Sequence, residues 1–474
     1  MNSGREASAR AVGGWVTAGI FAVYCLYLPF SGYREMVYDA LNYWTLTERF
    51  FHAGHFSLLA YNDALRGYFL PLLNLPAKAV THFTGLDPLW LTRLMGAGWA
   101  ALLFGWAGPG LWLTLFPRQQ LGWLPRVAFA ALGFLFWRDY FNFVLSDFPA
   151  LGLLVLGLWL ALRHPGAWWA ALGAGACLTA AANIRPVYLL ACPALLVLVL
   201  VVAPGRRARL TTLAVFGLGF ALVSGPQLLM NGRHHGVWTP LVLSRDARLP
   251  TANLYLAQLG WGLVIQKYET SLDPDFPSPR MLYTDPAGQA LLARQSIRHF
   301  AGYGAYVQMV LREPLTFAGL YGRHLFNGLD VQYPSLFVRR VPDRAGWLAL
   351  VHYTVWFGAL VIIGTSRGPG RLVVVASLVA LTLLLPCLAS LPIAIECRFL
   401  LPLQLLLYAV ACFGGAQWLA GRRWSGRQLG VLVVSYGLFV ALCCTLSAQT
   451  QAQLTHDVNV LAPLGGAEVP RKTP

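Results

Sequence analysis

The sequence predicts an all-α, polytopic membrane protein with about eleven transmembrane helices. Of its 474 residues, 57% are hydrophobic and only 11% are charged, which is more apolar surface than a soluble core can bury. The apolar residues form runs of roughly 17 to 25, the length that crosses a bilayer. The net charge of +16 comes from Arg clusters between these runs, a pattern that indicates membrane orientation and argues against a nucleic-acid partner.

Eleven apolar runs reach the length of a span, and each predicts one helix. They begin near residues 12, 88, 123, 147, 168, 187, 211, 346, 372, 399 and 428. The first run follows Arg5 and Arg10, continues to Phe30 and has no small-residue cleavage site before Ser31. We therefore expect an uncleaved first span and not a removed signal peptide.

The linkers between the runs alternate in charge. The linkers of one set, with the N-terminus, contain thirteen of the 35 basic residues but only one of the 19 acids, Glu6. These basic residues are Arg5, Arg10, Arg118, Arg126, Arg163, Arg206, Arg207, Arg209, Arg367, Arg371, Arg422, Arg423 and Arg427. The positive-inside rule places this set and the N-terminus in the cytoplasm.

The other set then lies outside the membrane. It consists of two long polar segments, 31–87 and 231–345, the short turns 138–147, 184–186 and 391–398, and the tail from about Ser447. This division predicts a transmembrane module over 1–230 that includes the first outer loop, an extracytoplasmic region over 231–345, and a C-terminal transmembrane module over 346–474.

Both long outer loops contain segments typical of amphipathic surface helices. In the run from Tyr38 to Gly54, apolar side chains recur at helical spacing, with Asp39 before the expected helix and Gly54 after it. The segment Leu65–Thr81 contains Pro71 and Pro76, which predict a kink or break. The segment Phe300–Phe326 predicts two helices that are separated at Pro314 and packed at the membrane interface.

Three outer charges lie at the ends of predicted spans. Asp39 follows the first span beside Tyr38 and Tyr43, where it either caps a helix or reaches both a polar acceptor and a lipid headgroup. Asp147 opens a span two residues before a proline, which fits a helix cap or a functional acid. Arg185 either extends to water along its stem or presents its guanidinium to a phosphate.

The last outer turn contains Glu396 and Arg398 at the start of the tenth span. Residues two apart on a helix do not face each other, so we expect each to contact a different partner. The eight cysteines lie within or beside apolar runs without ligand spacing, and we expect them to be core residues. The pairs His52/His55 and His234/His235 have no third ligand at matching spacing, so we expect no metal site there.

The order of these features resembles the GT-C superfamily of membrane glycosyltransferases, which includes protein mannosyltransferases and lipid A aminoarabinose transferases. The resemblance rests on Asp39 after the first span, Asp147 opening the fourth, and Arg185-Pro186 between the fifth and sixth. It continues with NGRHHGVWTPLVLSRDARLPTANLYLAQ after the seventh span and with ECRFLLPL at Glu396–Leu403.

The resemblance implies that a sugar moves from a polyprenyl-phosphate carrier to an acceptor on the extracytoplasmic side. Asp39 would be the catalytic base and Asp147 the second acid, both in the module 1–230. Arg185 and Arg398 would bind the donor phosphate, and Glu396 would orient Arg398 or bind sugar hydroxyls. Tyr38 and Tyr43 would offer flat surfaces to sugar rings.

The sequence departs from the family pattern at the acids. Asp39 is followed by Ala40 and Asp147 by Phe148, so closely paired acids are missing and a divalent cation is not favoured. One base without a covalent intermediate would invert the anomeric centre. We expect a lipid-linked sugar donor, a glycan, lipid or protein acceptor, the bilayer of a bacterial plasma membrane, and no nucleic acid.

Three other functions fit parts of the pattern. A secondary transporter also has spans with a few ionisable groups, but these would lie mid-span, whereas here they gather at the outer ends. A ligase or polymerase of undecaprenyl-pyrophosphate-linked glycans would place acids and arginines on the same face. A non-catalytic assembly protein is the third alternative.

Overall fold

The computed structural model describes residues 2–249, 251–295, 297, 299–341, 344–366, 370–420, 425–457 and 460–461. Within these residues, seven helices are long and apolar enough to cross a membrane: Val12–Phe30, Pro88–Leu115, Gly205–His235, Gly346–Thr365, Leu372–Ser390, Cys397–Ala420 and Gly426–Gln451. This agrees with an all-α membrane protein. Arg367, Arg422 and Arg423 of the predicted cytoplasmic linkers lie outside the described residues.

Each of the eleven predicted runs coincides with a helix, but their number as spans is not confirmed. The four runs from residues 123, 147, 168 and 187 form shorter helices, Trp123–Trp137, Asp147–Arg163, Trp168–Ile184 and Pro186–Val202. The residues Arg138–Asn142 wind into a 3-10 turn between the first two. This turn shortens the helix before it.

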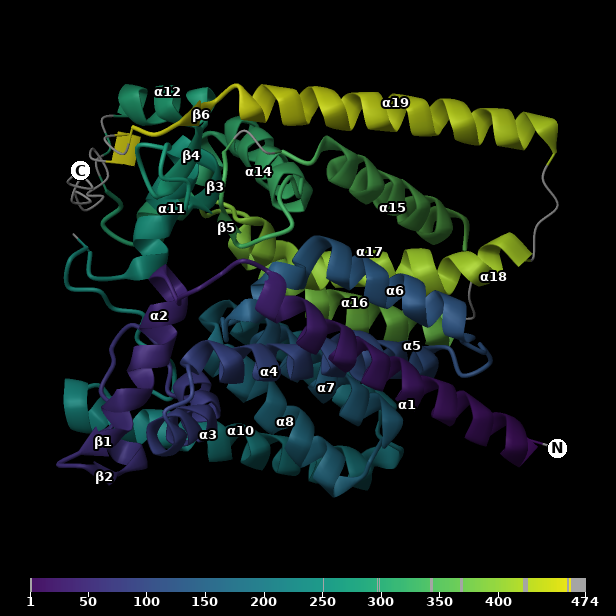
Figure 1. Cartoon of the computed structure of the whole chain (residues 1–474), viewed down its shortest axis with the longest axis horizontal. Coiled ribbons are helices and arrows are strands. Elements are labelled where there is room, and N and C mark those ends of the chain that lie inside the picture. Colours follow the sequence, from purple (N-terminus) through teal and green to yellow (C-terminus); the bar gives the residue numbers. More distant parts are fainter. Residues whose placement is uncertain are drawn as a thin grey trace. The chain divides into compact units, whose positions relative to one another are not determined.

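The chain divides into two compact units. Unit 1 comprises residues 1–243, 362–386 and 405–420, and unit 2 comprises 244–361, 387–404 and 421–474. In Figure 1, the helices and strands that begin within unit 1 are α1 (Asn2–Tyr27), α2 (Tyr38–Thr45), β1 (Phe51–His52), β2 (His55–Phe56), α3 (Phe69–Thr84), α4 (Pro88–Ala100), α5 (Gly108–Leu115), α6 (Trp123–Trp137), α7 (Asp147–Arg163), α8 (Trp168–Ile184), α9 (Cys192–Val202), α10 (Gly205–His235), α16 (Gly370–Ser390) and α18 (Gly415–Ala420).

Small residues bring α8 and α10 of unit 1 close together. A Cβ on Gly175 would lie 2.1 Å from the carbonyl oxygen of Phe216, and one on Gly219 would lie 2.1 Å from that of Leu172. Only glycine permits this approach, as at many helix crossings inside membranes. The crossing fixes α8, whose last residue precedes Arg185, against α10.

The elements that begin in unit 2 include a small sheet that the sequence did not predict. They are α11 (Leu254–Val264), β3 (Ile265–Ser271), β4 (Arg280–Thr284), α12 (Pro286–Gln295), α13 (Tyr303–Arg312), α14 (Pro314–Leu329), β5 (Phe337–Val338), α15 (Gly346–Thr365), α17 (Leu401–Ala409), α19 (Gly426–Gln451) and β6 (Leu454–Thr455). The strand order is β5-β3-β4-β6, with β3 parallel to β5 and antiparallel to β4. The segment 231–345 is therefore a folded α/β region and more than a loop with surface helices.

The predicted surface helices are only partly confirmed. The break at Pro314 is confirmed, because α13 ends at Arg312 and α14 begins at Pro314. In the first loop, α2 ends at Thr45, and Gly54 lies in the hairpin turn between β1 and β2. The predicted break at Pro71 or Pro76 is wrong, since α3 continues through both.

Candidate functional site

Several helix ends of unit 1 meet at the face that the charge pattern predicts to be extracytoplasmic. Asn142, after α6, accepts hydrogen bonds from Ser31, after α1, at 2.7 Å and from Arg93 of α4 at 3.2 Å. Arg93 also donates to the carbonyl oxygen of Tyr33 at 2.6 Å. These buried contacts fix the start of the first outer loop, which leads to Asp39.

Asp39 lies in the first turn of α2 and is partly buried. The prediction that it precedes or caps the helix is wrong, since Val37 is the N-cap residue. The preceding residue, Tyr38, has φ +48°. A non-glycine residue in this left-handed region is strained, and such strain persists where the surrounding structure imposes it, often near functional sites.

Tyr43 connects α2 to the start of α7. Its hydroxyl donates to Oγ of Ser146 at 3.3 Å, and Ser146 directly precedes Asp147. The guanidinium of Arg66 lies over the Tyr43 ring, 5.3 Å from its centroid. Because Asp39 and Tyr43 are four residues apart on α2, they lie on one side of this helix.

The buried carboxylate of Asp147 forms an ion pair with the guanidinium of Arg185, at the end of α8. The Asp147 side chain is 0% exposed and that of Arg185 is 16% exposed. From the sequence, Asp147 was expected to be an acid and Arg185 a separate phosphate ligand, whereas in the structure they form an ion pair. Asp147 is closed to solvent, so it orients Arg185 and is not placed to take a proton from a substrate.

A chain of buried amides, which the sequence analysis missed, supports this end of α8. Asn183 donates to Gln227 at 2.9 Å, and Gln227 donates to Asn231 at 3.0 Å. Asn183 also accepts from the backbone N–H of Phe69 at 2.8 Å. The amides join α8, α10 and the first loop, and Asn183 lies two residues before Arg185. Amide side chains within apolar helices are unusual, and this feature of the sequence could have identified them.

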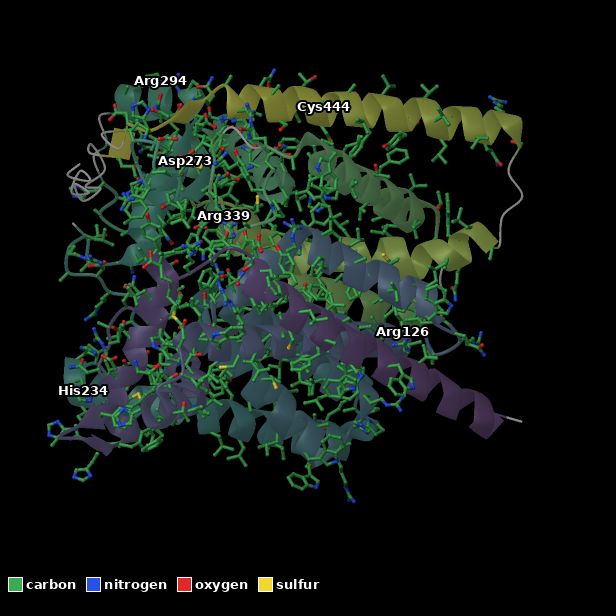
Figure 2. The ribbon with its side chains drawn as sticks, in the orientation of Figure 1. Arg126, His234, Asp273, Arg294, Arg339 and Cys444 are labelled. Carbon is green, nitrogen blue, oxygen red and sulfur yellow. The ribbon has the colours of Figure 1, made fainter. Side chains whose placement is uncertain are left out.

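The predicted loop histidines have no common role. The ring of His234, at the end of α10, lies 2.8 Å from the carbonyl oxygen of Leu59 and ties the first loop to this helix (Figure 2). His52 and His55 are paired residues of the β1–β2 hairpin and are exposed. Among the described residues, no group of three His, Cys, Asp or Glu side chains could hold a metal ion.

Glu396 and Arg398 belong to unit 2, and they bind each other. Nε of Arg398 lies 2.7 Å from Oε2 of Glu396, and Nη2 lies 3.1 Å from Oε1. The prediction of separate partners is wrong because Glu396 is an extended residue before a 3-10 turn, so helical spacing does not apply. Because Nε and Nη2 of Arg398 both bind Glu396, Arg398 is a weaker candidate than Arg185 for binding a phosphate.

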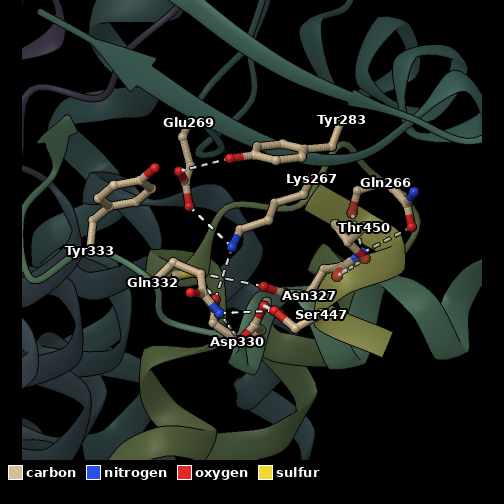
Figure 3. A network of polar contacts seen from close by, with 12 residues as sticks. Gln266, Lys267, Glu269, Tyr283, Asn327, Asp330, Gln332, Tyr333, Ser447 and Thr450 are labelled. Carbon is tan, nitrogen blue, oxygen red and sulfur yellow. Dashed lines mark hydrogen bonds and ion pairs between the residues drawn. The ribbon is translucent and has the colours of Figure 1, made fainter. Parts of the chain in front are cut away.

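Unit 2 contains a buried charge network that the sequence did not predict (Figure 3). Lys267 of β3 is 0% exposed, and its Nζ lies 3.1 Å from Oε1 of Glu269. The same Nζ donates to the carbonyl oxygen of Asp330 at 2.9 Å. Burial is the largest single influence on Lys267 and opposes its charge, but Glu269, Cys397 and Asp330 together outweigh burial and raise the pKa of Lys267.

Asp330, at the end of α14, joins this network to two further helices. Its carboxylate accepts hydrogen bonds from Tyr353 of α15 at 2.6 Å, from Ser447 of α19 at 2.8 Å and from Gln332 at 2.7 Å (Figure 3). With three donors satisfied, the buried carboxylate has the partners that burial demands. The network joins the end of α14 to α15 and α19.

The prediction that the eight cysteines are core residues is only partly confirmed, because Cys387, Cys397 and Cys443 are buried and four others are partly buried. Cys444 is exposed on α19 (Figure 2).

Comparisons of the chain with protein-family models, with curated proteins and with solved structures found no match.

Proposed function

We propose that the protein is a glycosyltransferase that moves a sugar from a polyprenyl-phosphate-linked donor to a glycan, lipid or protein acceptor outside a bacterial plasma membrane. The observation that carries the proposal is the Arg185–Asp147 pair at the end of α8. A guanidinium that is oriented by a buried carboxylate, on a side chain that is 16% exposed, suits a phosphate. Asp39 supplies the base. It lies on α2, which the hydrogen bond from Tyr43 to Ser146 joins to the start of α7.

The reaction follows from these roles. Asp39 takes the proton of the acceptor hydroxyl as its oxygen attacks the anomeric carbon, and the bond from that carbon to the phosphate oxygen breaks. Arg185 stabilises the negative charge that remains on the polyprenyl phosphate. A single displacement inverts the anomeric centre. Asp147 acts through Arg185 and does not serve as the second acid that the resemblance implies.

The test combines Asp39→Asn with two changes at Arg185. We expect Asp39→Asn to lower transfer by about a hundredfold to ten-thousandfold, the usual contribution of a positioned base. Arg185→Ala removes the phosphate ligand but also leaves Asp147 without its cation, so Arg185→Lys, which keeps the charge and loses the fork, is measured beside it. The readouts are surface glycan composition and the amount of lipid-linked sugar, both by mass spectrometry at matched protein levels.

Two matched variants control for charge and location. Glu48→Gln alters an exposed acid of the same loop, whose side chain is 63% exposed and pairs with Lys78. Arg233→Ala removes an exposed arginine from the last turn of α10. Neither control should change the glycans. Normal glycans and normal lipid-linked sugar in both Asp39→Asn and Arg185→Lys would end the transferase proposal.

A further inference from the structure

Helix α13 presents three different sides. Tyr306 and Met309 are buried in the core of unit 2. Tyr303, Val307 and Leu311, spaced four residues apart, are 48%, 52% and 75% exposed. Gln308 and Arg312 are exposed on the remaining side. A helix with one side in protein, one apolar and exposed, and one polar is suited to a membrane surface.

Helix α14 exposes an apolar side along its whole length. Phe317, Leu320 and His324 form its buried side. The exposed positions are all apolar or glycine: Pro314, Leu315, Ala318, Gly319, Gly322 and Leu325. Leu315 is 88% exposed. The cation of this helix, Arg323, is only partly exposed and binds Asp285 at 2.6 Å.

Helix α14 packs against a candidate span, α15, which also has exposed apolar residues. Phe326 of α14 packs against Tyr353 and Trp356 of α15, with ring centroids 6.4 Å and 6.3 Å apart. On α15, Trp347 and Leu350 are 60% and 45% exposed. The exposed apolar side of a spanning helix faces lipid, so the adjoining side of α14 shares that environment.

We propose that α13 and α14 form a membrane-embedded helical hairpin, in addition to the seven candidate spans, whose outer apolar face is covered by lipid acyl chains. This hairpin face consists of Tyr303, Val307, Leu311, Leu315, Ala318, Gly322 and Leu325. Arg312, beside it on α13, lies at the level of the headgroups, where its cation attracts anionic lipid. The proposal does not depend on the glycosyltransferase function.

The test places a photo-crosslinking amino acid at single positions of the full chain in vesicles of phosphatidylethanolamine and phosphatidylglycerol. Positions 311, 315 and 325 report on the hairpin face, and position 308, on the polar side of α13, is the matched control. All four are exposed, so the new side chain displaces no core residue. Mass spectrometry separates adducts to lipid from adducts to a second copy of the chain.

We expect lipid adducts at positions 311, 315 and 325 several times more abundant than at position 308. The proposal is overturned if positions 315 and 325 give no more lipid adduct than position 308. It is also overturned if they crosslink mainly to a second copy of the chain, because the face would then be a subunit interface.

Discussion

The two aspartates at the outer ends of helices in unit 1 have the same side chain but different surroundings. Asp39 is partly buried in the first turn of α2. The Asp147 side chain is 0% exposed and bound to Arg185. Breaking a buried pair from one side costs about 3 to 5 kcal/mol, because one charge is left buried without its partner. Loss of Asp147 would therefore leave the Arg185 cation without this partner, whereas Asp39 is not enclosed to the same degree.

Tyr68 provides a test of the loop's attachment through pH. Its buried hydroxyl donates to the carbonyl oxygen of Val223 at 2.9 Å, and burial raises the pKa of Tyr68 from its ordinary value of 10.0 to about 12. A raised pKa in the folded state stabilises the protein below the unfolded value, and the contribution is lost as pH rises through the folded value. We expect Tyr68→Phe to cost about 1 kcal/mol at pH 9.

The cost of Tyr68→Phe should shrink between about pH 10 and 12, because only the wild type then has to keep this buried phenol protonated. The free energy of unfolding of both proteins, measured in detergent across this range, gives the difference directly. A difference that stays constant with pH would show that Tyr68 ionises equally in both states.

At the scale of elements, the sequence locates helices better than it locates their ends. Each apolar run that was predicted to be a span forms a helix, because membrane lipid and a protein core both favour apolar residues. The end of α2 was misplaced because Gly54 marks a hairpin turn and not a helix end. The place of β5 in the sheet was missed because β5 pairs with β3 across a long stretch of sequence, at Thr270–Phe337, and such pairing leaves no local signal.

The contact between the first loop and α8 depends on one glycine. A Cβ on Gly67 would lie 2.2 Å from the carbonyl oxygen of Asn183, and this backbone atom cannot rotate away. We expect Gly67→Ala to push the loop off α8, break the Phe69–Asn183 hydrogen bond and destabilise unit 1 by roughly 1 to 3 kcal/mol. Unfolding in detergent and protease sensitivity of the loop measure this.

The matched control is Gly98→Ala in α4, where a Cβ meets nothing within 4 Å. It should leave the loop protected and the stability equal or slightly higher, because alanine favours a helix. Equal protease sensitivity in both variants would show that the loop is not fixed through Gly67.

At the scale of the whole molecule, the charge pattern assigned charged residues to one side of the membrane but did not predict which ion pairs they form. The charge pattern assigned Asp39, Asp147 and Arg185 to one side, and the structure brings the ends of α1, α4, α7 and α8 together in unit 1. It could not show that Asp147 neutralises Arg185 or that Glu396 occupies Arg398. Such pairings depend on side-chain geometry in three dimensions, which a linear charge pattern does not contain.

The Arg-rich linkers predict the orientation of the whole chain in the membrane, and this prediction is testable in cells. Single cysteines replace exposed residues in a Cys444→Ala background, which removes an exposed thiol. We expect a membrane-impermeant maleimide to label Ser57→Cys and Arg248→Cys in intact cells, because both lie in the acid-containing outer segments. Gln120→Cys and Ser425→Cys, beside cytoplasmic arginines, should be labelled only after permeabilisation. Labelling of residue 57 only after permeabilisation would place Asp39 in the cytoplasm, away from any acceptor outside the cell, and would contradict both the orientation and the transferase proposal.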